Sequence, residues 1–167
     1  MNAPALQREI EAFLAAYHVM SLATLADDGG PHAASLFYAP DGLGLVWTSD
    51  PAARHSQYLA ARPAVAATVA PDTSDFRSVH GVQITGAARR LPPGAEADRA
   101  SRLMRSRYPF LNQLAGGPLA LRAAFDKAGF YRLDPERLTL IDNAKGFGHK
   151  DTLRVLVGGA VALDGAS

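Results

Sequence analysis

The chain of 167 residues contains no cysteine, which excludes disulfide bonds and any reaction that needs a thiolate. Its net charge is only +1, too small to predict binding to nucleic acid or to an anionic membrane surface. The chain lacks an apolar run long enough to cross a bilayer. Its first residues also lack the basic and then apolar order of a signal peptide. We therefore expect a cytoplasmic protein that binds neither nucleic acid nor a membrane.

Common catalytic motifs are missing as well. No serine lies in the pattern of a hydrolase nucleophile elbow. The histidines are too scattered to predict a metal site, so no metal is expected; they are His18, His32, His55, His80 and His149. The sequence therefore assigns no catalytic residue. We expect His32 to lie exposed in a turn, and we interpret the Arg89-Arg90 pair as part of a solvated face.

The apolar pattern that is present favours a mainly β protein. Turns at 27–31 and 40–42 predict that the first three strands form an antiparallel meander, and a further turn is expected at 134–136. Gly86 lies inside the longest strand and predicts a bulge, which closure of a barrel would require. The predicted strands cover residues 19–26, 32–39, 43–48, 64–69, 79–91, 129–133 and 137–142, with an edge strand over 153–157.

Helical segments lie around these strands. The apolar residues between Leu6 and Tyr17 recur at helical spacing and predict an N-terminal helix over 5–17. A charged helical insertion is expected over 95–127, interrupted at Gly116-Gly117-Pro118. We expect one domain over residues 1–157 and a disordered tail over 158–167. The fold class is mainly β: a small closed antiparallel barrel of about six to seven strands with peripheral helices.

The stretch from Trp47 to Pro63 is the best candidate for a binding site. Asp50 suits the N-cap of a helix and Pro51 its first turn. The start of a helix presents unpaired backbone N–H groups and the positive end of the helix dipole, which favour an anion. Four side chains in this stretch add donors, and we call them the phosphate site: Thr48, Ser49, Arg54 and His55. The alternative interpretation is an ordinary strand-to-helix connection with a solvated Arg-His pair.

This order of elements resembles the FMN-binding split β-barrel of the pyridoxamine 5′-phosphate oxidase-like superfamily over about Ile10 to Lys150. The matching pieces are Trp47-Thr48, Ala53-Arg54-His55, Arg62-Pro63, the apolar segment 64–69 and the long strand Val82-Gln83-Ile84-Thr85-Gly86-Ala87-Ala88-Arg89-Arg90-Leu91. The most specific piece is the ending Asp142-Asn143 with Gly146-Phe147-Gly148-His149-Lys150. It resembles that of a smaller, uncharacterised bacterial branch of the superfamily.

The resemblance implies a homodimer with two FMN sites at its interface. FMN phosphate would be held by Thr48, Ser49, Arg54 and His55. The flavin ring would lie along the second strand and contact the backbone of Ala34, Ser35, Leu36 and Phe37, with Gln83 near the ring. Phe147, His149 and Lys150 would reach the site of the partner.

Departures from the family pattern change the expected activity. Ala34 stands where the oxidases carry an arginine that grips phosphate, Ala53 replaces a serine, and His55 replaces a lysine. The C-terminal arginine motif for the pyridoxamine substrate has no match. We therefore expect an FMN-dependent oxidoreductase for an unknown small molecule, and not a pyridoxamine phosphate oxidase. A flavin carries its own redox chemistry, which fits a chain without a catalytic cluster.

Two alternatives remain open. One is a dimeric module without turnover that binds a flavin or haem, with His149 or His55 as the axial ligand of haem. The other is a reductase that uses the deazaflavin F420 in place of FMN.

Overall fold

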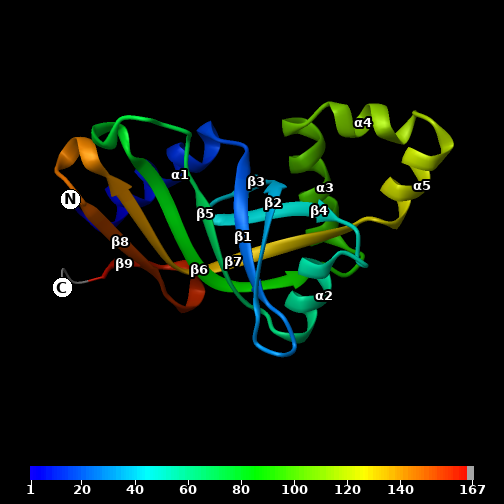
Figure 1. Ribbon diagram of the computed structural model, residues 1–167, viewed down its shortest axis with the longest axis horizontal. Helices are drawn as coiled ribbons and strands as arrows, with labels where there is room; N and C mark the ends of the chain where they lie inside the picture. The colour runs from blue at the N-terminus through cyan, green and yellow to red at the C-terminus, as the bar shows by residue number, and fades with distance from the viewer. Residues whose placement is uncertain (165–167) are drawn as a thin grey trace.

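One antiparallel sheet forms the body of the protein in a computed structural model that describes residues 1–164 (Figure 1). The order along the sheet is β2-β1-β5-β6-β7-β4-β3, with β8 added beside β7 and β9 beside β8. The nine strands in the described residues are β1 Val19–Leu25, β2 Pro31–Phe37, β3 Ala39–Asp41, β4 Gly44–Ser49, β5 Ala64–Val69, β6 His80–Arg90, β7 Gly129–Asp142, β8 Lys150–Val155 and β9 Val161–Leu163.

The sheet curls because its two end strands are consecutive in the chain. β2 and β3 lie at opposite ends of the order, yet only Tyr38 separates them. Tyr38 is fully buried, and its hydroxyl donates a hydrogen bond to the backbone oxygen of Leu14 (2.8 Å). The chain can make this connection only if the sheet bends round until its two ends approach each other. The predicted fold class, a split antiparallel barrel with peripheral helices, is confirmed.

The predicted meander of the first three strands is wrong. β1 pairs with β2 along its full length, but β3 and β4 pair with each other on the far side of the sheet. Pro40 and Asp41, expected in a turn, belong to β3. The chain reverses one step later, at Gly42, whose φ of +61° suits a two-residue hairpin between Asp41 and Gly44.

The turn expected at 134–136 is also absent, because β7 runs without a break from Gly129 to Asp142. β7 pairs with β6 along this length, and the register shifts between Thr85 and Gly86, so the bulge predicted at Gly86 is confirmed. Thr85 pairs with Arg137 and Gly86 with Pro135, which leaves Glu136 as the extra residue of a bulge. A Cβ at Gly86 would collide with the backbone oxygen of Asp134, so only glycine fits there.

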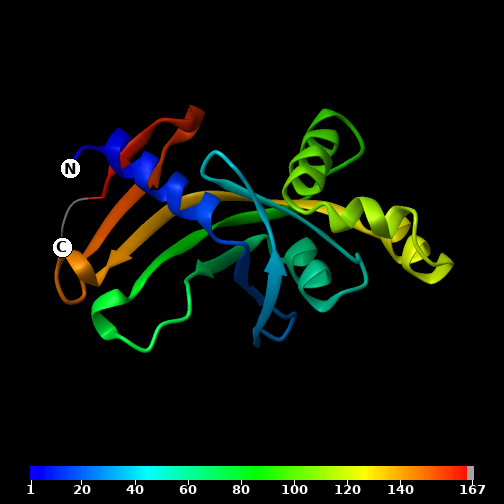
Figure 2. The ribbon, with the colours of Figure 1, turned by 90° about the horizontal axis from the view of Figure 1, so that it is seen from above.

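Helices close the openings of the barrel (Figures 1 and 2). α1 buries Leu6, Ile10, Phe13 and Leu14 against the barrel core, and α2 buries Leu59 at the other end. α3 packs on a second, smaller apolar cluster, and α4 and α5 extend away from the barrel (Figure 2). The helices are α1 Ala3–Ala16, α2 Arg54–Ala61, α3 Ala95–Arg107, α4 Phe110–Ala115 and α5 Leu119–Lys127, with short 3-10 turns η1 Phe76–Ser78, η2 Asn143–Lys145 and η3 Val157–Gly159.

Part of the tail predicted to be disordered is ordered. Within 158–167, residues 161–163 form β9, which pairs with β8, and Asp164 forms a salt bridge with Arg137 (2.9 Å). Alternating Val161 and Leu163 give this segment a strand pattern that is too short to stand out in the sequence. Residues 165–167 lie outside the described part of the chain. That residues 1–157 form one domain stays a prediction.

Candidate functional site

The start of α2 differs from the sequence prediction in a way that favours an anion. The helix begins at Arg54 with Ala53 as its N-cap, and none of the side chains in residues 1–164 caps it. Asp50, predicted to cap the helix, instead closes the preceding turn: its Oδ1 accepts a hydrogen bond from the backbone nitrogen of Ala52 (2.8 Å). Three turn residues therefore precede the helix, and Arg54 is its first residue. Because alanine has no side-chain acceptor, the first N–H groups of α2 remain available to a ligand.

Ser49 and His55 lie in direct contact at this helix start. Ser49 Oγ is 2.6 Å from Nε2 of His55, and His55 is buried, with 8% of its surface exposed. Burial lowers the pKa of His55, and the charge of His32 lowers it further. When the neutral imidazole carries its proton on Nδ1, its Nε2 accepts a hydrogen bond from the Ser49 hydroxyl. Neutral His55 therefore supplies no charge to the phosphate site, which leaves that role to the exposed Arg54.

Thr48 is turned toward the sheet, because its hydroxyl donates a hydrogen bond to the backbone oxygen of Gly129 (3.2 Å). Of the four predicted phosphate-site residues, Thr48, Ser49 and His55 are engaged in internal hydrogen bonds. Arg54 is exposed, and it lies at the start of the helix with the free N–H groups.

His32 was missed by the sequence prediction, which placed it exposed in a turn. It is half-buried on β2, and its ring meets that of Tyr58 on α2 edge to face, with centroids 5.6 Å apart. His32 lies two residues before Ala34, and alternate residues of a strand point to the same side. This spacing was the signal that could have placed His32 beside α2.

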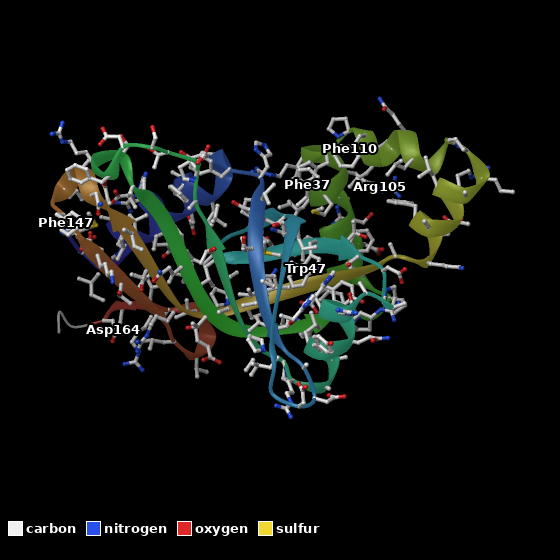
Figure 3. The ribbon with its side chains drawn as sticks, in the orientation of Figure 1. Phe37, Trp47, Arg105, Phe110, Phe147 and Asp164 are labelled. Carbon is white, nitrogen blue, oxygen red and sulfur yellow. The ribbon has the colours of Figure 1, made fainter. Side chains whose placement is uncertain are left out.

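The predicted ring contacts on β2 divide between two faces. Ser35 and Phe37 are exposed, whereas Ala34 and Leu36 are half-buried and point toward the barrel. Among residues 1–164, β2 pairs only with β1. The backbone N–H and C=O groups along its other edge are therefore not used in strand pairing and are available to a ligand. The Phe37 ring packs on Tyr108 (centroids 5.2 Å apart) and Phe110 (5.8 Å), at the top of the molecule in Figure 3.

Gln83 belongs to a line of polar residues across the outer face of the sheet. Strand pairing places one member on each of six adjacent strands, from β2 to β8. Thr139 and Thr152 within it are joined through their hydroxyls (3.0 Å). We call this line the polar row; it consists of Ser35, Ser21, Thr68, Gln83, Thr139 and Thr152.

The other predicted contacts, Phe147, His149 and Lys150, lie far from α2 within the same chain. Gly129 pairs with Ser49 at one end of β7, and Ile141 pairs with Lys150 near the other. A strand of this length spans on the order of 40 Å. Figure 3 shows Phe147 at one end of the molecule, and α2 lies toward the other end (Figure 1). One chain does not bring these two groups of residues together.

The loop that carries Phe147 is held in a defined shape. The Asn143 side chain donates to the backbone oxygen of Phe76 (2.7 Å) and accepts from the backbone nitrogen of Gly148 (3.0 Å). Phe147 is 86% exposed, and its ring lies edge to face with the Phe76 ring (centroids 6.2 Å apart). His149 Nε2 lies 2.8 Å from Asp151 Oδ2.

Two further observations concern what residues 1–164 do not contain. No three His, Asp or Glu side chains there are arranged to hold a metal ion. None of the helices in the same range has the length and hydropathy that crossing a bilayer requires.

Comparison with known proteins identifies the family. The family model for pyridoxamine 5′-phosphate oxidase matches residues 6–144. The chain belongs to this family. A UPF0306 protein from Photorhabdus laumondii is 27% identical over 152 residues, covering 90% of this chain and 96% of the relative. The predicted superfamily and bacterial branch are therefore confirmed.

Solved structures share the fold. A haem-binding protein from Mycobacterium smegmatis has a TM-score of 0.66 at 24% identity; the match covers 86% of this chain and 56% of that protein. An FAD-binding protein from Mesorhizobium loti has a TM-score of 0.62 at 23% identity, with 78% of this chain and 90% of that protein covered. The two proteins share this fold, and one is described as haem-binding and the other as FAD-binding.

Proposed function

We propose that this protein is a homodimeric FMN-binding flavoprotein and an FMN-dependent oxidoreductase acting on a small molecule other than pyridoxamine phosphate. The observation that carries the proposal is the uncapped start of α2, with Arg54 as its first residue and Ser49 beside it. Unpaired N–H groups and the positive end of a helix dipole favour a phosphate group. The cysteine-free chain suits the reducing cytoplasm, where we place the protein.

The residues present fit the parts of FMN. The N–H groups of α2 and the Arg54 guanidinium would hold the phosphate, with Ser49 and Thr48 as further donors. The polar row and the free edge of β2 offer hydrogen-bonding groups to the edge of a flavin ring, and Gln83 lies within that row. When bound, FMN supplies the redox chemistry. The role of the chain is to bind the cofactor, to orient it and to leave one ring face accessible.

A second copy of the chain is part of the proposal. Phe147, His149 and Lys150 lie at the far end of β7 from the phosphate site, so they can contribute to a site only in a partner. The exposure of Phe147 supports this role, because a large apolar side chain at a loop tip is stabilised by contact with another surface.

The first experiment is an absorption spectrum of the purified protein between 350 and 500 nm (roughly where oxidised flavin absorbs), with a fluorescence titration of added FMN. We expect bound flavin or quenching of FMN, and a dimer by light scattering. A colourless monomer that leaves FMN fluorescence unchanged contradicts the proposal. Mass spectrometry of the small molecule released on denaturation separates FMN from the deazaflavin F420.

Turnover needs a separate test. Flavin-loaded protein is mixed with NADH or NADPH in a stopped-flow device, and free FMN at the same concentration is the control. Bleaching of the flavin band that requires the protein supports an oxidoreductase. Bound flavin that stays oxidised supports a binding module without turnover.

One observation favours haem as a second candidate. His149 is partly exposed beside Phe147, and its Nε2 is held by Asp151, which leaves Nδ1 without a hydrogen-bond partner in the described residues. His55 is unsuited as an axial ligand, because it is buried and Ser49 holds its Nε2. Titration with haem tests this candidate: a Soret band that shifts in His149→Ala but not in His55→Ala supports it. Equal spectra for all three proteins rule out His149 as the ligand.

A further inference from the structure

Arg90 is exposed, as the sequence predicts for a solvated face, and it lies beside the phosphate site. It is the last residue of β6, and its guanidinium lies against Gly129 at the start of β7. A Cβ added to Gly129 would lie 2.8 Å from Nε of Arg90 and 3.4 Å from its Cζ. The space that a side chain at position 129 would fill is therefore taken by Arg90.

Strand pairing gives the direction of that space. Gly129 pairs directly with Ser49 in the antiparallel ladder of β4 and β7. Directly paired residues project to the same face of a sheet, with Cβ atoms about 4.5–5.5 Å apart. The Arg90 guanidinium consequently lies on the face to which Ser49 projects, one strand spacing away.

α2 passes over the same strand ends. It starts after Ser49 on β4, and its exit is fixed to β6, where the backbone nitrogen of Ala88 donates to the oxygen of Pro63 (2.8 Å). The bare helix start, Ser49 and Arg90 thus gather at one end of the barrel, with α2 beside the end of β6 (Figure 1).

The charge of Arg90 is not neutralised by a neighbour. Its sequence neighbour Arg89 forms salt bridges with Glu96 and Asp134 on the other face of the strand. Within residues 1–164, neither Arg90 nor Arg54 has a carboxylate within 4 Å. Two guanidinium groups without acidic partners therefore flank Ser49 and the start of α2.

We propose that Arg90 is a second phosphate-binding arginine of this site, with Gly129 kept free of a side chain so that the guanidinium can lie across it. It would supply from β6 the charge that Ala34 does not supply from β2. The identity of the ligand as FMN rests on the proposed function. The role of Arg90 toward a phosphate group does not depend on turnover.

The test compares FMN with riboflavin, which has the same ring without the phosphate, by fluorescence quenching. Arg90→Gln is expected to weaken FMN binding about 10- to 100-fold, the usual effect of one charge-assisted hydrogen bond. Riboflavin binding should not change. Arg89→Gln is the matched control, because it removes the same charge one residue away on the opposite face, and FMN affinity should stay within about twofold.

Gly129→Ala tests the geometry without removing a charge. The new methyl group must displace the guanidinium, so FMN affinity should fall, and Arg90→Gln with Gly129→Ala should bind no more weakly than Arg90→Gln alone. Arg90→Lys keeps the charge without the planar guanidinium, so its FMN affinity should lie between those of wild type and Arg90→Gln. It serves as the second variant if Arg90→Gln unfolds, as judged by circular dichroism.

The outcomes separate this inference from the proposed function. Wild-type protein that binds neither FMN nor riboflavin overturns both. Wild-type protein that binds FMN while Arg90→Gln matches Arg89→Gln overturns the role of Arg90 alone. An equal loss of FMN and riboflavin in Arg90→Gln has the same consequence, because it shows a general effect on the ring site. Competition by inorganic phosphate that disappears in Arg90→Gln supports the role directly.

Discussion

The barrel and the helical insertion are held together by different forces. In the described residues, the barrel core contains 22 buried residues drawn from between Leu6 and Leu153, whereas the cluster under α3 contains 7. α3 contributes Ala100 and Met104 to this smaller cluster and is also attached through charge. Asp41 on β3 forms a salt bridge with Arg99 of α3 through one carboxylate oxygen. It forms a second with Arg132 of β7 through the other oxygen (2.7 Å). α5 buries no side chain among those described.

This difference has consequences for stability. Apolar burial is independent of pH and weakly affected by salt, whereas an ion pair is lost when its carboxyl group is protonated. The barrel should therefore keep its packing under conditions that release α3. Trp47 is the single tryptophan of the chain, is fully buried and stacks on Tyr131 (centroids 5.7 Å apart). Its fluorescence reports on the barrel, and helical circular dichroism also reports on the insertion.

The largest expected effect comes from a cavity in the barrel core. Leu22 is fully buried in the middle of β1, and Leu22→Ala should lower the free energy of unfolding by about 2–5 kcal/mol. Met104→Ala is the matched change in the smaller cluster. In Met104→Ala, we expect the helical circular dichroism signal to fall at a lower urea concentration than the Trp47 fluorescence does. Coincident transitions for both probes in both variants would mean that barrel and insertion unfold as one unit.

Asp41→Asn should have the next largest effect, about 1–3 kcal/mol, because its side chain is only 14% exposed, Arg99 loses its carboxylate partner and Arg132 keeps only Asp134. The hydrogen bond from Arg99, helped by that from Arg132, holds the pKa of Asp41 below its usual range against the opposing effect of burial. The unfolded chain therefore binds the proton more readily. The stabilisation is complete above the unfolded pKa of about 4 and is lost as pH falls below it. The measurement is urea unfolding at pH 3 and pH 6 by helical circular dichroism. A wild-type difference that persists in Asp41→Asn would assign the acid sensitivity to another carboxyl group.

The sequence predicted the barrel better than its connections. Strand composition found most strands, and Gly86 predicted the bulge. However, the Pro40-Asp41-Gly42 and Asp134-Pro135-Glu136 triplets both carry turn chemistry, and local chemistry does not distinguish a turn from a short strand or a bulge. That decision is made by long-range pairing, of β3 with β4 and of β7 with β6.

The candidate site shows the same limit. Ser49 and His55, which are near in sequence and were grouped from their spacing, lie in contact; their role in a phosphate site stays a prediction. Arg90 and Gly129 lie far from them along the chain, and only the order β6-β7-β4 brings them to Ser49. His32 was missed for the same reason, since its neighbour Tyr58 belongs to another element.

His55 gives the barrel its own, milder pH dependence. Burial, and then the charge of His32, lowers the pKa of His55 in the folded protein. The unfolded chain, with an ordinary pKa near 6.5, therefore takes up the proton first, and the free energy of unfolding should decline as pH falls below about 6.5. We expect the free energy of unfolding, measured by urea unfolding with Trp47 fluorescence, to be lower at pH 5 than at pH 7, by less than the loss caused by Leu22→Ala. His55→Gln should flatten this slope; an unchanged slope would assign it to another group.

The smallest effect is expected at the far end of the barrel, where a charge is exposed. Lys145 Nζ lies 2.7 Å from Glu9 on α1, with about a third of each side chain exposed. Exposed ion pairs contribute little, because water screens them and two long side chains must be ordered. Lys145→Gln should therefore lower the free energy of unfolding, measured by urea unfolding, by less than about 1 kcal/mol. If Lys145→Gln destabilises the protein as much as Asp41→Asn does, burial is not what makes the Asp41 ion pairs important. The attachment of α3 would then need another explanation.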